Sequence, residues 1–257
     1  MSLRQEQDPA LEQAVPSGRL ERTEQRRTAE TTMPDRTSPT RPDSGASRWA
    51  IVLAAGGGTR FGAEKQFVRA AGHRLVDLAV DAAAAVCDHV IVVLPAGRAW
   101  DGRPVHAAVA GGSDRPSSVR NGLAAIPDTD GTIIVHQAAN PLADAALLRT
   151  LFTAIEGGAA AAVPGLSPAD LVRRVADDRL GEIVGRDDLV LVQTPAAFRL
   201  PVLRAAHQQQ LEALEDTALV SALGHEVVVV PGDPRNVHVA SPQDLELVAA
   251  LLAYRLS

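Results

Sequence analysis

Short runs of consecutive apolar and β-branched residues recur along the chain from Trp49 onward. They are continuous rather than alternating, which is typical of strands covered on both faces, as in a mainly parallel sheet. Segments with helical spacing of apolar residues lie between and after them. We expect strands at 49–55, 88–94, 131–136, 159–163, 189–194 and 227–230, and helices at 73–86, 117–126, 143–156, 201–214 and 242–254. This alternation predicts an α/β fold: a three-layer, doubly wound sandwich with a mainly parallel sheet.

Two segments depart from the alternation. Residues 1–47 mix Arg, Glu, Gln, Thr, Ser and Pro with no apolar periodicity, so we expect a disordered N-terminal tail before a single domain at 48–257. Within that domain, two short strand-like pieces flank the polar turn DDRLG. They predict a β-hairpin arm at about 168–188.

Charge and cysteine content exclude several classes of protein. The net charge of −6 argues against broad attraction to nucleic acid or to an anionic membrane, and no apolar run approaches the roughly 20 residues that cross a bilayer. The single cysteine, Cys87, excludes an internal disulfide and a zinc site built from several cysteines. We therefore expect a cytoplasmic protein that binds neither nucleic acid nor membrane.

The first strand runs directly into the glycine-rich stretch AAGGGTRFGAEK at 54–65. A glycine-rich turn at the carboxyl end of a strand allows backbone N–H groups to approach phosphate oxygens, although it also suits a simple tight turn. Two cations follow, Arg60 and Lys65, and Lys65 is the only lysine of the chain. Cations beside such a loop can neutralise a triphosphate, so the stretch is a candidate triphosphate site.

Six ordered stretches resemble the signature stretches of the 2-C-methyl-D-erythritol 4-phosphate cytidylyltransferase family. They are AAGGGTRFGAEKQF (54–67), GGSDRPSSVRNGL (111–123), VHQAANPL (135–142), LVQTPAAF (191–198), EDTALVSALG (215–224) and NVHVASPQDL (236–245). Ribitol-phosphate cytidylyltransferases share most of them. The resemblance implies a Rossmann-like nucleotidyltransferase fold and a reaction in which a sugar-alcohol phosphate attacks the α-phosphorus of CTP, releasing pyrophosphate.

The resemblance also implies roles for particular residues. Arg60 and Lys65 match the pair that stabilises the transition state. Nucleotide binding is implied for Ala54, Ala55, Gly56, Gly58, Gly112 and Ser118, and substrate positioning for Arg186, Thr194 and His238. The family further implies Mg²⁺ as cofactor, CTP and a sugar-alcohol phosphate as partners, and a homodimer formed through the arm.

The chain departs from the family pattern mainly where acceptor and metal would bind. Gln137 and Asn140 replace an aspartate that helps to bind Mg²⁺ and a nearby arginine, and His238 replaces a lysine. A neutral amide is a poor Mg²⁺ ligand, so the metal ligand is left unassigned. We consider methylerythritol phosphate the first acceptor, with another acceptor such as ribitol 5-phosphate, or a catalytically weak nucleotide-binding paralogue, as alternatives.

Three aspartates elsewhere in the chain have a simpler interpretation than metal binding. Asp144, Asp216 and Asp233 stand beside expected helices and turns, so helix capping or turn formation is the preferred reading.

Overall fold

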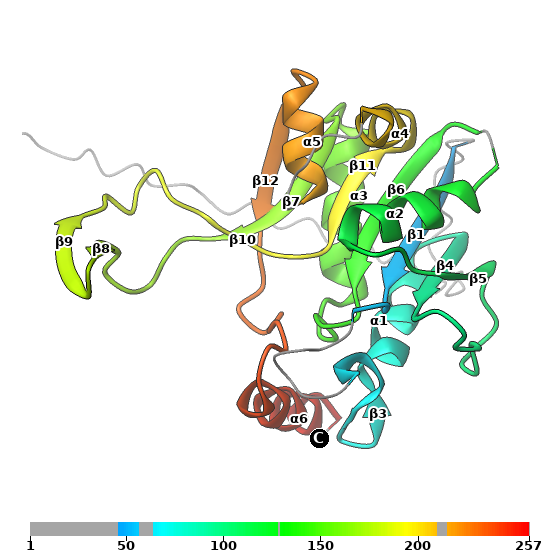
Figure 1. Cartoon of the computed structure of the whole chain (residues 1–257), viewed down its shortest axis with the longest axis horizontal. Helices are drawn as coiled ribbons and strands as arrows, with labels where there is room; N and C mark the ends of the chain where they lie inside the picture. The colour runs from blue at the N-terminus through cyan, green and yellow to red at the C-terminus, as the bar shows by residue number, and fades with distance from the viewer. Residues whose placement is uncertain (1–45, 57–63, 128, 210–214, 257) are drawn as a thin grey trace, which may run out of the picture. The chain divides into compact units, whose positions relative to one another are not determined.

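The computed structural model describes residues 46–56, 64–127, 129–209 and 215–256. Within these residues, an eight-stranded sheet has the order β10-β7-β11-β6-β1-β4-β5, with β12 paired to β7. The sheet strands are β1 (Ser47–Leu53), β4 (His89–Leu94), β5 (Ala107–Ala110), β6 (Gly131–Gln137), β7 (Ala161–Leu166), β10 (Leu191–Val192), β11 (Ala196–Arg199) and β12 (Val227–Pro231). Strand β1 lies inside the sheet, between β6 and β4 (Figure 1).

The central strands pair in parallel, as predicted. Strand β1 is parallel to both β4 and β6, β4 is parallel to β5, and β12 is parallel to β7. The antiparallel exceptions are β11, which is inserted between β6 and β7, and β10 at the edge of β7. From β1 the chain first adds β4 and β5 on one side and then crosses to β6 on the other side. This reversal creates a topological switch point between the neighbouring strands β1 and β6.

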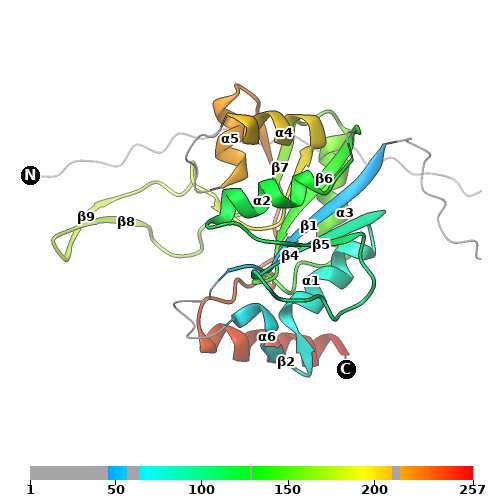
Figure 2. The same cartoon turned by 45° about the vertical axis from the view of Figure 1, so that its right-hand side comes forward.

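Helices cover both faces of the sheet, which explains why its central strands are continuous apolar runs. Ala50 and Val52 of β1 pack in one buried cluster with α1 (Leu75–Ala84) and α3 (Ala145–Glu156). Trp49 and Ile51 point to the other face and pack with α2 (Arg115–Ala124), α4 (Leu200–Gln208) and α5 (Asp216–Ala222). The three layers are visible in the two views (Figure 2).

The carboxyl ends of β1 and β6 are followed by a smaller layer of secondary structure. Helix α6 (Pro242–Leu256) packs there on β2 (Arg69–Ala70), which pairs with β3 (His73–Arg74), and the short 3₁₀ helix η1 (Lys65–Phe67) packs on α1. Leu142, Val239 and Val248 belong to the buried cluster that joins these pieces. This layer brings Lys65 and the 236–240 segment to the same end of the sheet as the glycine-rich stretch.

A hairpin of β8 (Arg173–Ala176) and β9 (Arg179–Ile183) forms a separate two-stranded sheet inside the segment where we expected the arm. Asp177 and Asp178 make its turn with positive φ values of 48° and 59°, a conformation that Asp adopts more readily than most residues. Every residue of the two strands is exposed. The hairpin stands away from the layered part of the domain (Figure 1).

The sequence prediction of an α/β fold is confirmed, with differences in detail. Strands β5 and β11 and helix α5 were not predicted, and β10 is a two-residue exposed edge strand rather than the buried strand expected at 189–194. Among the described residues, every helix is too short or too polar to cross a lipid bilayer. Most of the proposed tail, residues 1–45, lies outside the described residues.

Candidate active site

The first part of the candidate site lies at the switch point, where β1 and β6 end side by side. Leu53 is paired with Gln137, and the N–H of Ala138 donates to the Leu53 carbonyl at 3.0 Å. The N–H of Ala54 donates to Val93 of β4 at 2.8 Å. Ala54, Ala55 and Gly56 therefore leave the sheet between two neighbouring strands, where ligands of doubly wound folds bind. Gly58 and Arg60 lie outside the described residues.

Helix η1 continues from the glycine-rich stretch and carries Lys65. The buried Gln66 side chain donates through Nε2 to the Gly56 carbonyl at 3.0 Å, which ties η1 to the end of the first loop. Lys65 Nζ donates to the carbonyl of Val239 at 2.6 Å. The ammonium group thus links the end of the glycine-rich stretch to the segment that contains His238.

The second loop precedes α2 and contains Gly112. A Cβ on Gly112 would clash with Ser117, and one on Gly111 would clash with Ala55, so both positions need glycine for close packing. The buried Ser118 hydroxyl accepts from the Gly112 N–H at 3.1 Å and donates to the Asp114 carbonyl at 2.8 Å. Ser118 therefore shapes this loop, and Gly111, which the sequence prediction omitted, fits it against the first loop.

Asp114 closes the second loop as the N-cap of α2. Its carboxylate accepts from the Ser117 N–H at 2.7 Å, while the Ser117 hydroxyl accepts from the Asp114 N–H at 3.0 Å. The Ser117 hydrogen bonds hold the pKa of Asp114 below its usual value. A capping box of this kind fixes the direction in which the helix begins.

Thr194 and His238, for which the family resemblance implies substrate positioning, are linked through two buried amides. The His238 ring is 2.9 Å from Asn140 Oδ1, measured at Nδ1. Asn140 Nδ2 donates to Asn236 Oδ1 at 3.4 Å, and Asn236 Nδ2 donates to the Thr194 carbonyl at 2.7 Å. Asn236 was not among the predicted site residues, although its stretch, NVHVASPQDL, carries the family resemblance.

Arg186 follows the β9 strand of the arm and is exposed. Its Nη1 donates to the Ala169 carbonyl at 2.8 Å, which closes the base of the arm. The structure therefore places Arg186 on the arm, separately from the switch-point residues.

Asp216 belongs to a buried cluster of charged and polar side chains. The sequence analysis had predicted a cap or turn residue at this position. Asp216 is the first residue of α5 and 1% exposed, and it accepts from Arg115 at 2.7 Å. His207 Nε2 lies 3.0 Å from its other oxygen. Burial raises the pKa of Asp216, but the His207 hydrogen bond and the Arg115 charge outweigh it and hold the pKa below its usual value. The cap or turn reading of Asp216 is therefore wrong: its carboxylate anchors the start of α2 to α4 and α5.

The other two aspartates play the local roles that we expected. Asp144 caps α3 by accepting from the N–H groups of Ala146 and Leu147. Asp233 accepts from the Arg235 N–H at 2.8 Å in a turn and pairs with the Arg235 guanidinium.

The described residues do not fit a magnesium ion held by the protein alone. No group of three or more His, Cys, Asp or Glu side chains among them is arranged to bind a metal. At the end of β6, Gln137 offers only an amide oxygen, whereas Mg²⁺ prefers carboxylate and phosphate oxygens. The use of Mg²⁺ stays a prediction.

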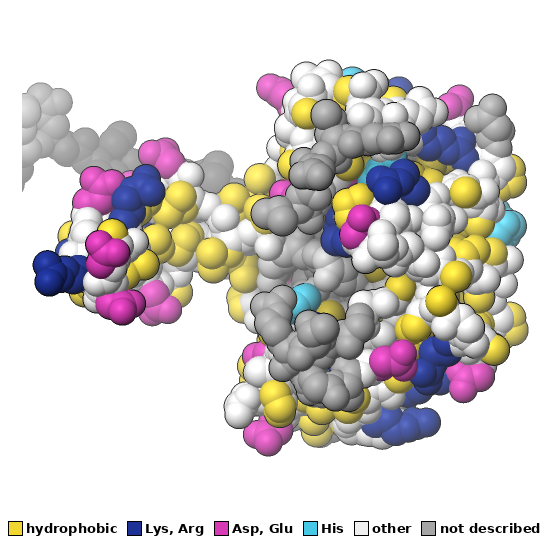
Figure 3. Space-filling view, viewed as in Figure 1, with side chains coloured by type: hydrophobic (Ala, Val, Ile, Leu, Met, Phe, Trp, Pro, Cys, Tyr) yellow, Lys and Arg dark blue, Asp and Glu magenta, His cyan; other side chains and the backbone are white. Residues whose placement is uncertain are grey.

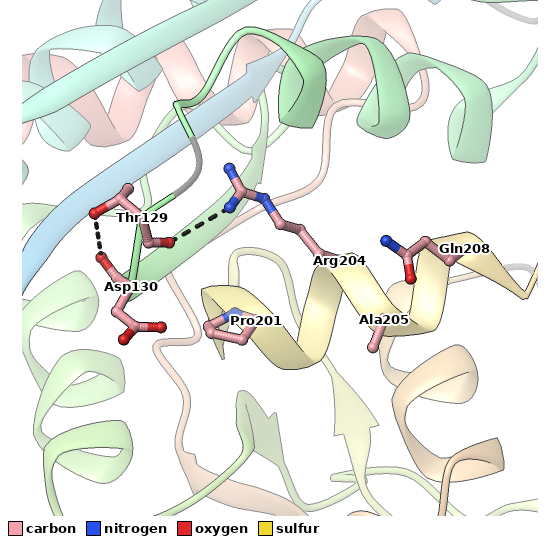
Figure 4. Close-up of a pocket in the computed structure, with 6 residues that line it drawn as sticks. All are labelled: Thr129, Asp130, Pro201, Arg204, Ala205 and Gln208. Carbon is pink, nitrogen blue, oxygen red and sulfur yellow. Dashed lines mark hydrogen bonds between the residues drawn. The ribbon is translucent and has the colours of Figure 1, made fainter.

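A cavity of about 440 Å³ lies elsewhere, beside the amino end of β6. Thr129 and Asp130 line it from the segment before β6, and Pro201, Arg204, Ala205 and Gln208 line it from α4 (Figure 4). The Arg204 guanidinium donates to the carbonyls of Ile126 and Pro127, which follow α2. Since β6 reaches the candidate site at its other end, this cavity is separate from it.

Comparisons with known proteins agree with this arrangement. The family model of IspD, 2-C-methyl-D-erythritol 4-phosphate cytidylyltransferase, matches residues 49–254. A cytidylyltransferase of that name from Salinibacter ruber is 39% identical over 218 residues, covering 78% of this chain and 91% of the relative. One from Nocardia farcinica is 40% identical over 232 residues, covering 83% and 97%. The crystal structure of the enzyme from Thermus thermophilus has a TM-score of 0.69 and 31% identity, covering 79% of this chain and 98% of that one.

The sheet topology, the two loops at the switch point and these matches define the class of the protein, an α/β nucleotidyltransferase. The family model spans nearly all of the layered domain. The chain belongs to the 2-C-methyl-D-erythritol 4-phosphate cytidylyltransferase family.

Proposed function

We propose that the protein transfers a cytidylyl group from CTP to 2-C-methyl-D-erythritol 4-phosphate in the non-mevalonate route to isoprenoids. The observation that carries the proposal is the family match over residues 49–254, together with relatives at 39 and 40% identity that bear this activity in their names. A phosphate oxygen of the acceptor attacks the α-phosphorus of CTP. The bond from that phosphorus to the bridging oxygen breaks, and pyrophosphate leaves.

The two loops at the switch point are suited to the nucleotide. The first loop brings Ala54, Ala55 and Gly56 to the switch point, where the Ala54 N–H is bonded to Val93, and Gly58 continues the loop in sequence. The second contributes Gly112 and is held in shape by Ser118. Backbone N–H groups of such loops bind phosphate and base edges without adding charge.

Lys65 supplies positive charge beside the first loop, and Arg60 is its expected partner in the sequence. In phosphoryl transfer, catalysis comes mainly from alignment and from neutralising the charge that develops on the phosphorus oxygens and the leaving group. The Val239 contact orients the Lys65 side chain. We assign Lys65 and Arg60 the role of stabilising this charge.

The remaining residues are suited to the acceptor. Thr194 and His238 stand at the two ends of the chain of hydrogen-bonded amides. Arg186 lies on the arm, where exposed Leu171, Val175, Leu180 and Ile183 give an apolar surface. We propose that this surface packs against a second copy of the chain, so that Arg186 helps to hold acceptor phosphate in a homodimer. The apolar side chains of the arm and its base are visible in the space-filling view (Figure 3).

Pyrophosphate release tests the proposal directly. The full chain is supplied with CTP, Mg²⁺ and, in turn, methylerythritol phosphate, ribitol 5-phosphate and other alcohol phosphates, beside the Lys65→Ala variant. We expect turnover with methylerythritol phosphate and a loss of about 100-fold or more in Lys65→Ala. Turnover only with another acceptor would refute the assignment of substrate. CTP binding without any turnover would indicate a nucleotide-binding paralogue.

A further inference from the structure

Asn140 and Asn236 form a chain of hydrogen bonds that ends on the His238 ring. The chain joins parts of the protein that are far apart in sequence, the turn after β6, the segment after β10 and the segment before α6. Both asparagines are 3% exposed, whereas His238 is exposed at the end of the chain. A buried amide keeps only those orientations in which its donors and acceptors are satisfied.

The backbone carbonyl of Thr194 fixes the direction of the whole chain. A carbonyl only accepts, so the group of Asn236 that faces it must be the amide NH₂. The Asn236 oxygen then faces Asn140, which must present its own NH₂ there and its oxygen to the histidine. Because that oxygen also only accepts, His238 must carry a proton on Nδ1.

Hydrogen bonds fix the backbone that follows His238. The next residue, Val239, donates its N–H to the Ala139 carbonyl at 2.8 Å and accepts from Lys65. Lys65 on η1 contacts this segment through the Val239 carbonyl, and Asp244 on α6 interacts electrostatically with His238. Asp244 also binds the N–H groups of Ala240 and Ser241, which fixes the backbone that follows.

We propose that Asn236 and Asn140 are positioning residues that hold His238 as the Nδ1–H form, so that the ring meets the acceptor through Nε2. In the neutral ring, Nε2 carries a lone pair and accepts a hydrogen bond from a hydroxyl group of the sugar-alcohol acceptor. The dianionic phosphate, which predominates above about pH 6, has no proton to donate to it, so this contact selects for the alcohol part of the acceptor. The inference rests on the proposed function for the identity of the acceptor, but not for the state of the ring.

Nitrogen NMR of the free enzyme tests the state of the ring without any turnover. The seven histidines are labelled with ¹⁵N, and the His238 signals are assigned by their loss in His238→Gln. At a pH where the ring is neutral, we expect the Nδ1–H form in the unmodified protein and a shift toward the Nε2–H form, which imidazole prefers in water, in Asn140→Ala. An Nε2–H ring in the unmodified protein overturns the proposal.

Kinetics with the active acceptor then test the consequence. Asn140→Ala and Asn236→Ala are expected to raise the KM for the alcohol phosphate about 3- to 10-fold, the value of one hydrogen bond, with the KM for CTP changed less than twofold. The double variant His238→Ala/Asn140→Ala is expected to match His238→Ala alone. Gln208→Ala, an exposed amide on α4 beside the separate cavity, is the control and keeps both KM values.

Two kinetic results would contradict the proposal that Asn140 and Asn236 position His238. One is equal increases in both KM values, and the other is additive losses in the double variant. Absence of turnover with every acceptor would refute the proposed function instead, and it would leave the NMR result standing. The two proposals therefore fail in distinguishable ways.

Discussion

His136 is expected to make the protein less stable in mild acid. The ring lies in β6 with an exposed fraction of 0%, and neither of its nitrogens has a hydrogen-bond partner in the described part of the chain. Burial lowers the pKa of His136 to about 4 from an ordinary value of 6.5. The folded protein therefore keeps this ring neutral at a pH where the unfolded chain protonates it.

The sign and size of the effect follow from linkage. Below pH 6.5 the unfolded state binds a proton that the folded state does not, so the free energy of unfolding falls as the pH falls toward 4. Each pH interval of one costs about 1.4 kcal/mol in this window. His136 alone should therefore remove about 2 kcal/mol between pH 8 and pH 5, and about 3 kcal/mol by pH 4.

Urea unfolding at pH 8 and pH 5, at one fixed protein concentration, measures this loss. His136→Leu should remove about 2 kcal/mol of the difference between the two pH values, because leucine has no proton to bind. His225→Gln, which changes an exposed histidine, is the control and should keep the difference. If His136→Leu and the unmodified protein lose the same stability between pH 8 and pH 5, the reasoning is refuted.

Three further changes test other parts of the structure. Asp216→Ala should lower the free energy of unfolding by about 1–3 kcal/mol, because it leaves the Arg115 guanidinium and the buried His207 ring without their shared acceptor, and urea unfolding at pH 7 checks this. Gln137→Asp should lower the Mg²⁺ concentration needed for half-maximal pyrophosphate release, since it adds a carboxylate at the end of β6; an unchanged requirement would contradict that placement. Leu180→Asp should shift the protein from the proposed dimer toward monomer in light scattering, because Leu180 is 71% exposed on the arm, whereas Glu182→Gln on the same strand should not.

The central strands could be predicted from the sequence because each is buried on both faces and is therefore a continuous apolar run. Strand β5 was not predicted because it is a half-exposed edge strand of four residues, AAVA. Strand β11 was not predicted because it is short, and its place between β6 and β7 depends on pairing with distant residues. Helix α5 has only seven residues and begins with a buried aspartate, so its pattern resembles a loop.

Some residues of the candidate site could likewise be predicted from the sequence, and others could not. Lys65 could be singled out because it is a lone lysine close behind a glycine-rich turn, and both features are local in the sequence. The chain of hydrogen bonds from Thr194 to His238 could not be predicted, because Asn140 and Asn236 are 96 residues apart and their amide orientations are set by the Thr194 carbonyl. Likewise, the need for glycine at Gly111 comes from the approach of Ala55 in another loop.

The 236–240 segment connects Lys65, on the proposed nucleotide side of the site, with His238, on the proposed acceptor side. Its Val239 carbonyl receives the Lys65 ammonium group, and the preceding residue, His238, ends the amide chain from Thr194. A shift of this segment would therefore move the Lys65 ammonium group and the His238 ring together. Since in-line transfer depends on aligning the attacking oxygen with the leaving pyrophosphate, a shared backbone segment preserves that alignment better than two independently mobile loops would.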